Sequence, residues 1–131
     1  MTIADEKYIA VQTYKKSGDA VTTCCWITGL SDGRVGFWTS SDSFKYKRLK
    51  RDARIAIQPS DGRGRPKAGS SVLTGTAQIV ESGPEFDAIM KQIPKKYGVM
   101  VPISKFFSVL GHIGKPKFHY GNVGVVITLD S

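Results

Sequence analysis

Short segments rich in β-branched and aromatic residues recur along this chain, and tight polar turns separate them. The first three cover residues 8–14, 20–28 and 34–40, with glycine and aspartate in the turns between them. Two more follow at residues 54–60 and 71–80. Strands this short and this closely spaced are typical of all-β sandwiches and barrels. We expect the first three to form a β-meander.

The segment at residues 71–80 (SVLTGTAQIV) alternates between apolar and polar positions, and its apolar residues share one face with Gly75. This period of two predicts a half-buried strand. A glycine in the middle of such a strand predicts a bulge or a bend of a barrel. The apolar run at residues 123–130 (VGVVITLD) predicts a last strand with a central place in the sheet.

A short helix from Ser43 to Asp52 is predicted after the third strand, with Ser41 or Asp42 as its N-cap. Two further helical patterns precede the last strand. Together these elements predict a mainly β fold, a β-barrel with accessory helices. One short helix follows strand 3, and two helices come before the last strand.

The two later helices have apolar and aromatic stripes, which we interpret as core packing rather than as a cofactor site. The first is expected to start at a capping box of Ser82 and Glu85 and to end or kink at Pro94. The second covers residues 103–113, with Gly114 as its C-cap.

Length and composition indicate one soluble domain. A chain of 131 residues, 40% hydrophobic and 23% charged, has the usage of an ordinary globular domain. We therefore expect a single domain over residues 1–131. No apolar run is long enough to span a bilayer and no signal-peptide pattern opens the chain, so we expect a cytoplasmic protein.

The net charge is +8 at pH 7. A charge of this size suggests a polyanionic partner. Nucleic acid, an acidic membrane surface, and a phosphorylated or polycarboxylate small molecule all fit this description. Which of them applies depends on where the basic side chains lie.

Few residues indicate a chemistry of their own. His112 and His119 are the only histidines, and neither has a metal-ligand partner at a useful spacing. Cys24 and Cys25 are adjacent, so in a strand they point to opposite faces and cannot form an ordinary disulfide. No nucleotide-loop or hydrolase motif is present. We expect no metal and no catalytic constellation, so a reactive group would come from a cofactor.

The stretch at residues 39–45 has the composition of an anion site. The start of the predicted helix offers free N–H groups and the positive end of the helix dipole. Four hydroxyl residues lie between positions 39 and 43, and Lys45 follows in the first turn. These groups suit a phosphate. A solvated basic helix face accounts for the same residues without a ligand, and the residues alone leave both interpretations open.

The order of these segments resembles a known family. The stretches SGDAVTTCCWI, DGRVGFWTS, SDSFKYKRLKRDARIAI and GTAQIV follow one another between about residues 7 and 80. This order resembles the FMN-binding split β-barrels of the pyridoxamine-5'-phosphate-oxidase-like superfamily. It is most similar to their branch of coenzyme F420 (deazaflavin)-dependent oxidoreductases.

The resemblance implies a set of cofactor contacts. The family's phosphate-binding lysine falls on Lys45, whereas the second basic residue that usually precedes it is replaced here by Ser43 or Phe44. Arg48 or Lys47 is the expected substitute. The ring is expected along the second strand, and the phosphate near the end of the third. The residues that the resemblance assigns to the cofactor are Lys45, Ser43, Thr39, Trp38, Arg48, Thr23, Cys24, Cys25 and Trp26.

The implied activity is hydride transfer between a reduced deazaflavin and a small organic acceptor. Coenzyme F420 is favoured over FMN because it is more anionic, and the basic loop at residues 61–70 is expected to be flexible and to lie over its tail. Tyr8, Tyr14 and Trp26 are candidates for the substrate side. The family resemblance further implies a homodimer with the cofactor at the subunit interface.

The expected partners are a small-molecule substrate and a second copy of the chain, with no nucleic acid and no membrane. Two alternatives to the enzyme remain open. One is a barrel that carries the cofactor without turnover. The other is a small barrel that binds single-stranded nucleic acid, which the net charge and the aromatic strands would suit.

Overall fold

The computed structural model describes residues 2–30, 32–98, 100–101 and 122–130. The helix expected at residues 103–113, Gly114 and both histidines lie outside these ranges. The elements in chain order are the 3₁₀ helix η1 (Ile3–Asp5), β1 (Ile9–Tyr14), β2 (Ala20–Cys25), β3 (Thr28–Gly29), β4 (Val35–Thr39), α1 (Phe44–Arg51), β5 (Arg54–Pro59), β6 (Leu73–Val80), α2 (Pro84–Tyr97) and β7 (Val123–Leu129).

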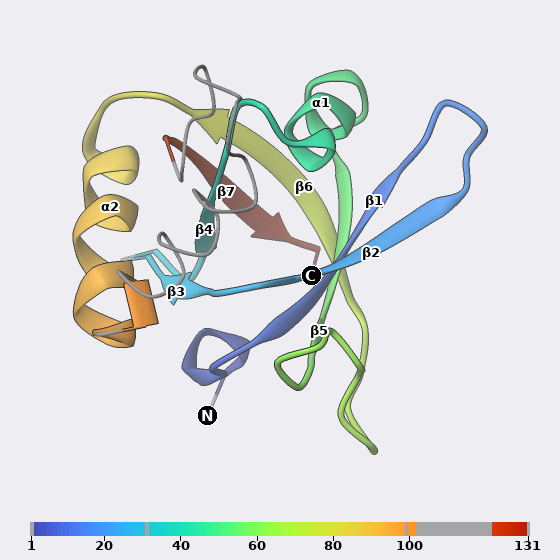
Figure 1. The fold of residues 1–131 in the computed structure, drawn as a ribbon, viewed down its shortest axis with the longest axis horizontal. Helices are drawn as coiled ribbons and strands as arrows, with labels where there is room; N and C mark the ends of the chain where they lie inside the picture. Colours follow the sequence, from blue (N-terminus) through green and yellow to red (C-terminus); the bar gives the residue numbers. More distant parts are fainter. Residues whose placement is uncertain (1, 31, 99, 102–121, 131) are drawn as a thin grey trace, which may run out of the picture.

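The strands form one seven-stranded antiparallel sheet in the order β2-β1-β5-β6-β7-β4-β3. The edge strands β2 and β3 are consecutive in the chain, with only Trp26 and Ile27 between them. The sheet therefore curls until its two edges meet at this connection (Figure 1). This confirms the predicted split β-barrel with accessory helices. The central position of β7, between β6 and β4, is also confirmed.

The expected three-stranded meander is wrong. β1 and β2 do form a hairpin, with Ile9 opposite Cys25 and Tyr14 opposite Ala20. However, β4 pairs with β3 and β7 and not with β2. The reason is that the chain passes from one edge of the sheet to the other directly after β2, so the next hairpin belongs to the opposite edge.

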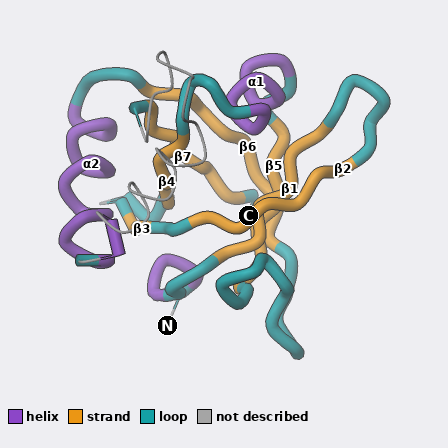
Figure 2. The backbone as a smooth tube through the Cα atoms, in the orientation of Figure 1, coloured by secondary structure: helices purple, strands orange, loops and turns teal. Residues whose placement is uncertain are grey.

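Two apolar clusters lie on the two sides of the curled sheet. The first fills the barrel and includes Ile9, Ile27, Phe37, Ile57 and Ile127, each at most 1% exposed. The second lies under α2, which covers one side of the barrel (Figure 2), and centres on Ile89, Ile93, Tyr97 and Val126. Burying a side chain of this size contributes about 1.5–3 kcal/mol, so these clusters provide the main stabilisation of the fold.

Helix α1 confirms the predicted position, but its N-cap is Ser43 and not Ser41 or Asp42. The Ser43 backbone is extended, and its Oγ accepts the N–H of Tyr46 at 3.1 Å. Asp52 is the C-cap. An N-cap lies directly before the first helical residue, which fixes Ser43 for a helix that begins at Phe44.

Helix α2 differs from the prediction at both ends. Its N-cap is Gly83, and the expected capping box at Ser82 does not form because the cap has no side-chain hydrogen bond. The helix also continues through Pro94 to Tyr97. Interior proline costs a helix about 3 kcal/mol. Here the buried side chains of Ile93 and Tyr97 hold the last turn against the barrel and offset that cost.

Gly75 is not a bulge, because the ladder between β5 and β6 runs one to one through it. A Cβ atom at this position would collide with the carbonyl oxygen of Thr128 on β7. The glycine is therefore required by the close approach of two neighbouring strands. Among the described residues, no helix is long and apolar enough to cross a membrane.

Candidate anion and cofactor site

Lys45 extends from the first turn of α1 toward β2. Its Nζ lies 2.9 Å from the Sγ of Cys25 and 5.6 Å from the ring centroid of Phe37. Cys25 is 7% exposed and belongs to the barrel core. Among the described residues, no carboxylate forms an ion pair with Lys45. Within the described part of the chain, the ammonium group therefore meets a thiol and an aromatic ring but no opposite charge that would neutralise it.

Thr39 and Ser43 lie beside this lysine, where β4 ends and α1 begins. Their hydroxyl oxygens are 3.1 Å apart, and Thr39 is 7% exposed. Since Ser43 caps the helix, the N–H groups of Phe44 and Lys45 have no acceptor within the helix. The start of α1 thus carries Ser43 and Lys45, and the hydroxyl of Thr39 lies against that of Ser43, which are the kinds of donor that an anion site at a helix start requires.

The two cysteines face opposite sides of β2, as the sequence predicts, and both are free thiols. Cys25 faces inward, with the Oγ1 of Thr23 3.9 Å from its Sγ. Cys24 faces outward and donates to the carbonyl oxygen of Asp61 at 3.6 Å. Burial, and next the neighbouring Cys25, raise the pKa of Cys24. Cys25 is therefore the cysteine that contacts Lys45 directly.

Trp26 and Trp38 form a separate aromatic group against α2. The Trp26 ring stacks on Tyr97 with centroids 4.5 Å apart, and Trp38 lies 6.4 Å from Trp26 in a tilted arrangement. The sequence grouped Trp38 with Thr39 on the phosphate side. The structure separates them, because consecutive residues of β4 point to opposite faces of the sheet.

Arg48 and Lys47 have other contacts in the described structure, and their expected role as substitutes for a second phosphate contact stays a prediction. The Nε of Arg48 donates to the Oγ1 of the buried Thr13 on β1 at 2.6 Å. Burial, and next the charge of Arg51, lower the pKa of Arg48. Lys47 is exposed, with its Nζ over the ring of Phe44. Arg48 therefore fastens α1 to the sheet, and Lys47 faces solvent.

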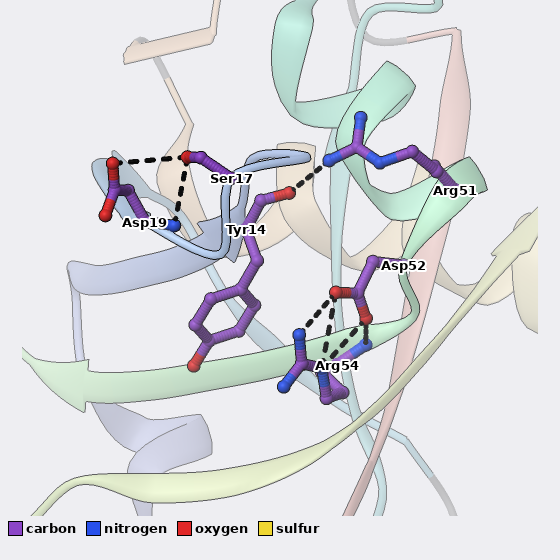
Figure 3. A network of polar contacts seen from close by, with 6 residues as sticks. All are labelled: Tyr14, Ser17, Asp19, Arg51, Asp52 and Arg54. Carbon is purple, nitrogen blue, oxygen red and sulfur yellow. Dashed lines mark hydrogen bonds and ion pairs between the residues drawn. The ribbon is translucent and has the colours of Figure 1, made fainter.

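The three aromatic candidates for the substrate side do not gather in one place. Tyr8 and Tyr14 flank opposite ends of β1, which are about 20 Å apart at the rise of a strand. Trp26 packs under α2. Arg54 lies over the Tyr14 ring at 4.9 Å and pairs with Asp52 (Figure 3). The three candidates therefore do not line one common pocket in the described structure.

The loop at residues 61–70 makes several defined contacts. The Asp61 carboxylate accepts the backbone N–H groups of Arg63 and Arg65, and it pairs with the Arg65 side chain at 2.8 Å. These backbone hydrogen bonds, first that of Arg65, lower the pKa of Asp61. Lys67 pairs with Glu6. Two of the three basic side chains of this loop are therefore neutralised in place.

A polar contact at the end of α2 has no signal in the sequence. The hydroxyl of Tyr97 accepts the N–H of Ile27 at 3.0 Å and donates to the carbonyl of Lys7 at 2.7 Å. Burial raises the pKa of Tyr97 to about 12. The Nζ of Lys96 donates to the carbonyls of Ala4, Glu6 and Ile27, and its partial burial lowers its pKa. In the sequence, only the helical spacing of Tyr97 relative to the buried isoleucines was informative, and it indicated a packing role.

No family model matches the sequence, and no curated protein matches it. Solved structures do match. The conserved hypothetical protein Rv2991 from Mycobacterium tuberculosis has a TM-score of 0.68 and 20% identity, over 98% of this chain and 76% of that one. The heme storage protein HutZ from Vibrio cholerae has a TM-score of 0.64 and 10% identity, over 97% and 84%.

A protein from Listeria innocua, described as a candidate pyridoxamine 5'-phosphate oxidase, matches with a TM-score of 0.59 and 15% identity, over 96% of this chain and 86% of that one. The chain thus has the split-barrel fold of the pyridoxamine-5'-phosphate-oxidase-like proteins. The matched structures include candidate oxidases and a heme storage protein, so the fold alone does not define an activity.

Proposed function

We propose that the chain binds a phosphate-bearing tricyclic redox cofactor and serves as an oxidoreductase. Coenzyme F420 is our first candidate and FMN the second. The observation that carries this proposal is the position of Lys45. Its ammonium group lies between the first turn of α1 and β2, with no carboxylate partner among the described residues.

The donor set suits a phosphate group. Lys45 supplies a full positive charge, Thr39 and Ser43 supply hydroxyls, and the first N–H groups of α1 supply backbone donors. A thiol is a weak acceptor for an ammonium group. A phosphate that approaches Lys45 would therefore be a stronger partner than Cys25, and the flexible lysine stem allows the exchange.

The preference for F420 rests on the family resemblance more than on the loop at residues 61–70. Arg65 and Lys67 of this loop are paired with Asp61 and Glu6, which leaves Arg63 as its one basic side chain without a carboxylate partner in the described structure. A polycarboxylate tail would have to compete with those pairs. The structural match to the candidate oxidase from Listeria innocua supports a flavin more than a deazaflavin.

When bound, such a cofactor supplies hydride transfer to an activated double bond or a similar acceptor. The protein's task is then to hold and orient the ring and to exclude water. Lys45, Thr39 and Ser43 would hold the phosphate, and the backbone of β2 from Thr23 to Trp26 would lie along the ring. The apolar barrel behind Cys25 excludes water from that side. A second copy of the chain would complete the pocket.

Binding titrations with F420, FMN and heme test this proposal. We expect quenching or polarisation of F420 fluorescence with saturation at one cofactor per chain, and weaker binding of FMN. Tighter binding of FMN would leave the proposed oxidoreductase activity in place and identify FMN, not F420, as the cofactor. Binding of heme alone, or of none of the three, would reject the proposal.

Enzyme and carrier are separated by a second measurement. The reduced cofactor bound to the protein is mixed with candidate acceptors, and its reoxidation is followed by absorbance. Reoxidation faster than that of the free cofactor supports an enzyme. Binding without acceleration for any acceptor supports a carrier.

A further inference from the structure

The positive charge of this chain is concentrated in two segments. Residues 15–19 and 42–54 together contain eight basic and three acidic side chains, which gives +5 of the net charge of +8. The segments are the tip of the β1–β2 hairpin and α1 with its flanks. They lie side by side in space, because the Nη2 of Arg51 donates to the carbonyl oxygen of Tyr14 at 2.6 Å (Figure 3).

Four of these basic side chains are free of polar partners. Lys45 and Arg48 turn toward the sheet, Arg51 holds Tyr14, and Arg54 pairs with Asp52. The remaining four are exposed and make no ion pair or hydrogen bond within the described structure. We name them the lysine face: Lys15, Lys16, Lys47 and Lys50.

Phe44 lies next to the lysine face and is exposed to an unusual degree. Its exposed fraction is 73%, the largest of any large hydrophobic side chain in the described structure. The Nζ of Lys47 is 5.3 Å from its ring centroid. The hairpin tip and α1 both project from the same side of the barrel (Figure 1). A bare aromatic ring among lysines on a projecting surface is typical of contact with a membrane interface.

We propose that the lysine face and Phe44 bind the surface of an anionic phospholipid bilayer. The lysines attract the headgroups, and the Phe44 ring inserts at the headgroup level. This proposal departs from the expectation of no membrane partner, and the lack of a spanning segment has no bearing on contact with a membrane surface. This inference is independent of the cofactor proposal, because Lys45 points away from the lysine face.

The free side chains favour lipid over nucleic acid. Lysine is a compact, strongly hydrated charge that suits a diffuse anionic surface. The arginines, whose planar groups read phosphates and bases in pairs of hydrogen bonds, are held by Thr13, Tyr14 and Asp52. Single-stranded nucleic acid also needs several aromatic rings for stacking. In these two segments, Tyr46 lies under Lys50 and is half-buried, which leaves Phe44 as the exposed ring.

Vesicle co-sedimentation of the full chain tests this proposal, with phosphatidylcholine alone and with phosphatidylcholine mixed with phosphatidylglycerol. We expect binding to the mixed vesicles only, and its loss at high salt. One lysine near an anionic surface changes the binding constant about fivefold. The double variant Lys47→Glu, Lys50→Glu should therefore bind at least about 25-fold more weakly, and Phe44→Ser should also bind more weakly.

The matched control is Lys91→Glu, Lys95→Glu, two exposed lysines of α2 with the same change in net charge. It should retain binding to within about threefold. An equal loss in the control would overturn the proposal, since net charge alone would then explain the binding. Two other results would also overturn it: no binding to the mixed vesicles, or tighter binding of a thymidine oligonucleotide that depends on the same lysines.

Discussion

The Nζ of Lys45 lies 2.9 Å from the Sγ of Cys25, although 20 positions separate the two residues in the chain. The contact joins the first turn of α1 to the inner face of β2. It places a positive charge at the edge of an apolar barrel, where the field of that charge is screened less than at an open surface. The first prediction concerns this lysine.

Replacement of Lys45 by alanine should weaken cofactor binding. Loss of a charge-assisted contact costs about 1.5–3 kcal/mol, which corresponds to about ten- to a hundredfold in the dissociation constant. Fluorescence titration measures this change. Lys47→Ala, on the outer side of the same helix, is the control and should change the constant by less than about twofold. Equal affinities in all three proteins would remove Lys45 from the site.

Replacement of Tyr97 by phenylalanine should destabilise the fold. The hydroxyl accepts the N–H of Ile27 and donates to the carbonyl of Lys7, and its removal leaves a buried N–H group without a partner. We expect the free energy of unfolding to fall by about 1–3 kcal/mol. Urea denaturation measures this loss, and an unchanged midpoint would contradict the role given to the hydroxyl.

The same residue predicts a pH dependence. The pKa of Tyr97 is raised from 10 to about 12 in the folded protein. As pH rises above 10, the unfolded chain releases this proton first, so the free energy of unfolding should fall between pH 10 and 12. The slope for one proton is at most about 1.4 kcal/mol per pH unit. The difference in the free energy of unfolding between wild type and Tyr97→Phe isolates the contribution of this proton. This difference should be constant below pH 10.

Replacement of Lys96 by methionine should loosen the N-terminal segment. The Lys96 ammonium group donates to the carbonyls of Ala4 and Glu6 and to that of Ile27, and a thioether cannot replace these bonds. Amide hydrogen exchange should accelerate at residues 2–8 more than in the strands. Lys95→Met, on the exposed side of α2, should leave the exchange pattern unchanged. Uniform acceleration throughout the chain would point to global destabilisation instead.

Alanine should be tolerated less well at Gly75 than at Gly36. A Cβ at position 75 meets the rigid carbonyl of Thr128, whereas one at position 36 meets first the flexible end of Ile89, at 2.8 Å. Overpacking of this kind costs about 1–3 kcal/mol, and the rigid neighbour should give the larger value. Denaturation midpoints of both variants measure the order. The reverse order would show that β7 can shift at Thr128.

The sequence predicted most of the fold because strand alternation and helical periodicity are local signals. It placed α1 within one residue at each end, and it placed β7 in the middle of the sheet. It failed at Pro94 because the packing of Ile93 and Tyr97 decides whether that turn remains helical. It also failed at the third strand, because a switch between sheet edges leaves no local mark in the chain.

The candidate site was predicted in its residue types but not in its arrangement. The hydroxyls and Lys45 are neighbours in sequence, so the helix start alone brings them together. The family resemblance had grouped Trp38 with Thr39. The alternation of side chains along a strand would already have placed them on opposite faces of the sheet. The approach of Lys45 to Cys25 depends on how α1 packs across the barrel, which no local pattern encodes.

The connection of Trp26 and Ile27 is where the barrel is sealed, and it is only two residues long. The groups that grip it, the hydroxyl of Tyr97 and the ammonium of Lys96, come from the last turn of α2. The last turn of α2 therefore holds the connection between the two edge strands in place. Loss of this turn would free both edge strands, β2 and β3, at once. The stability of the closed barrel therefore depends on a helix that lies outside the sheet.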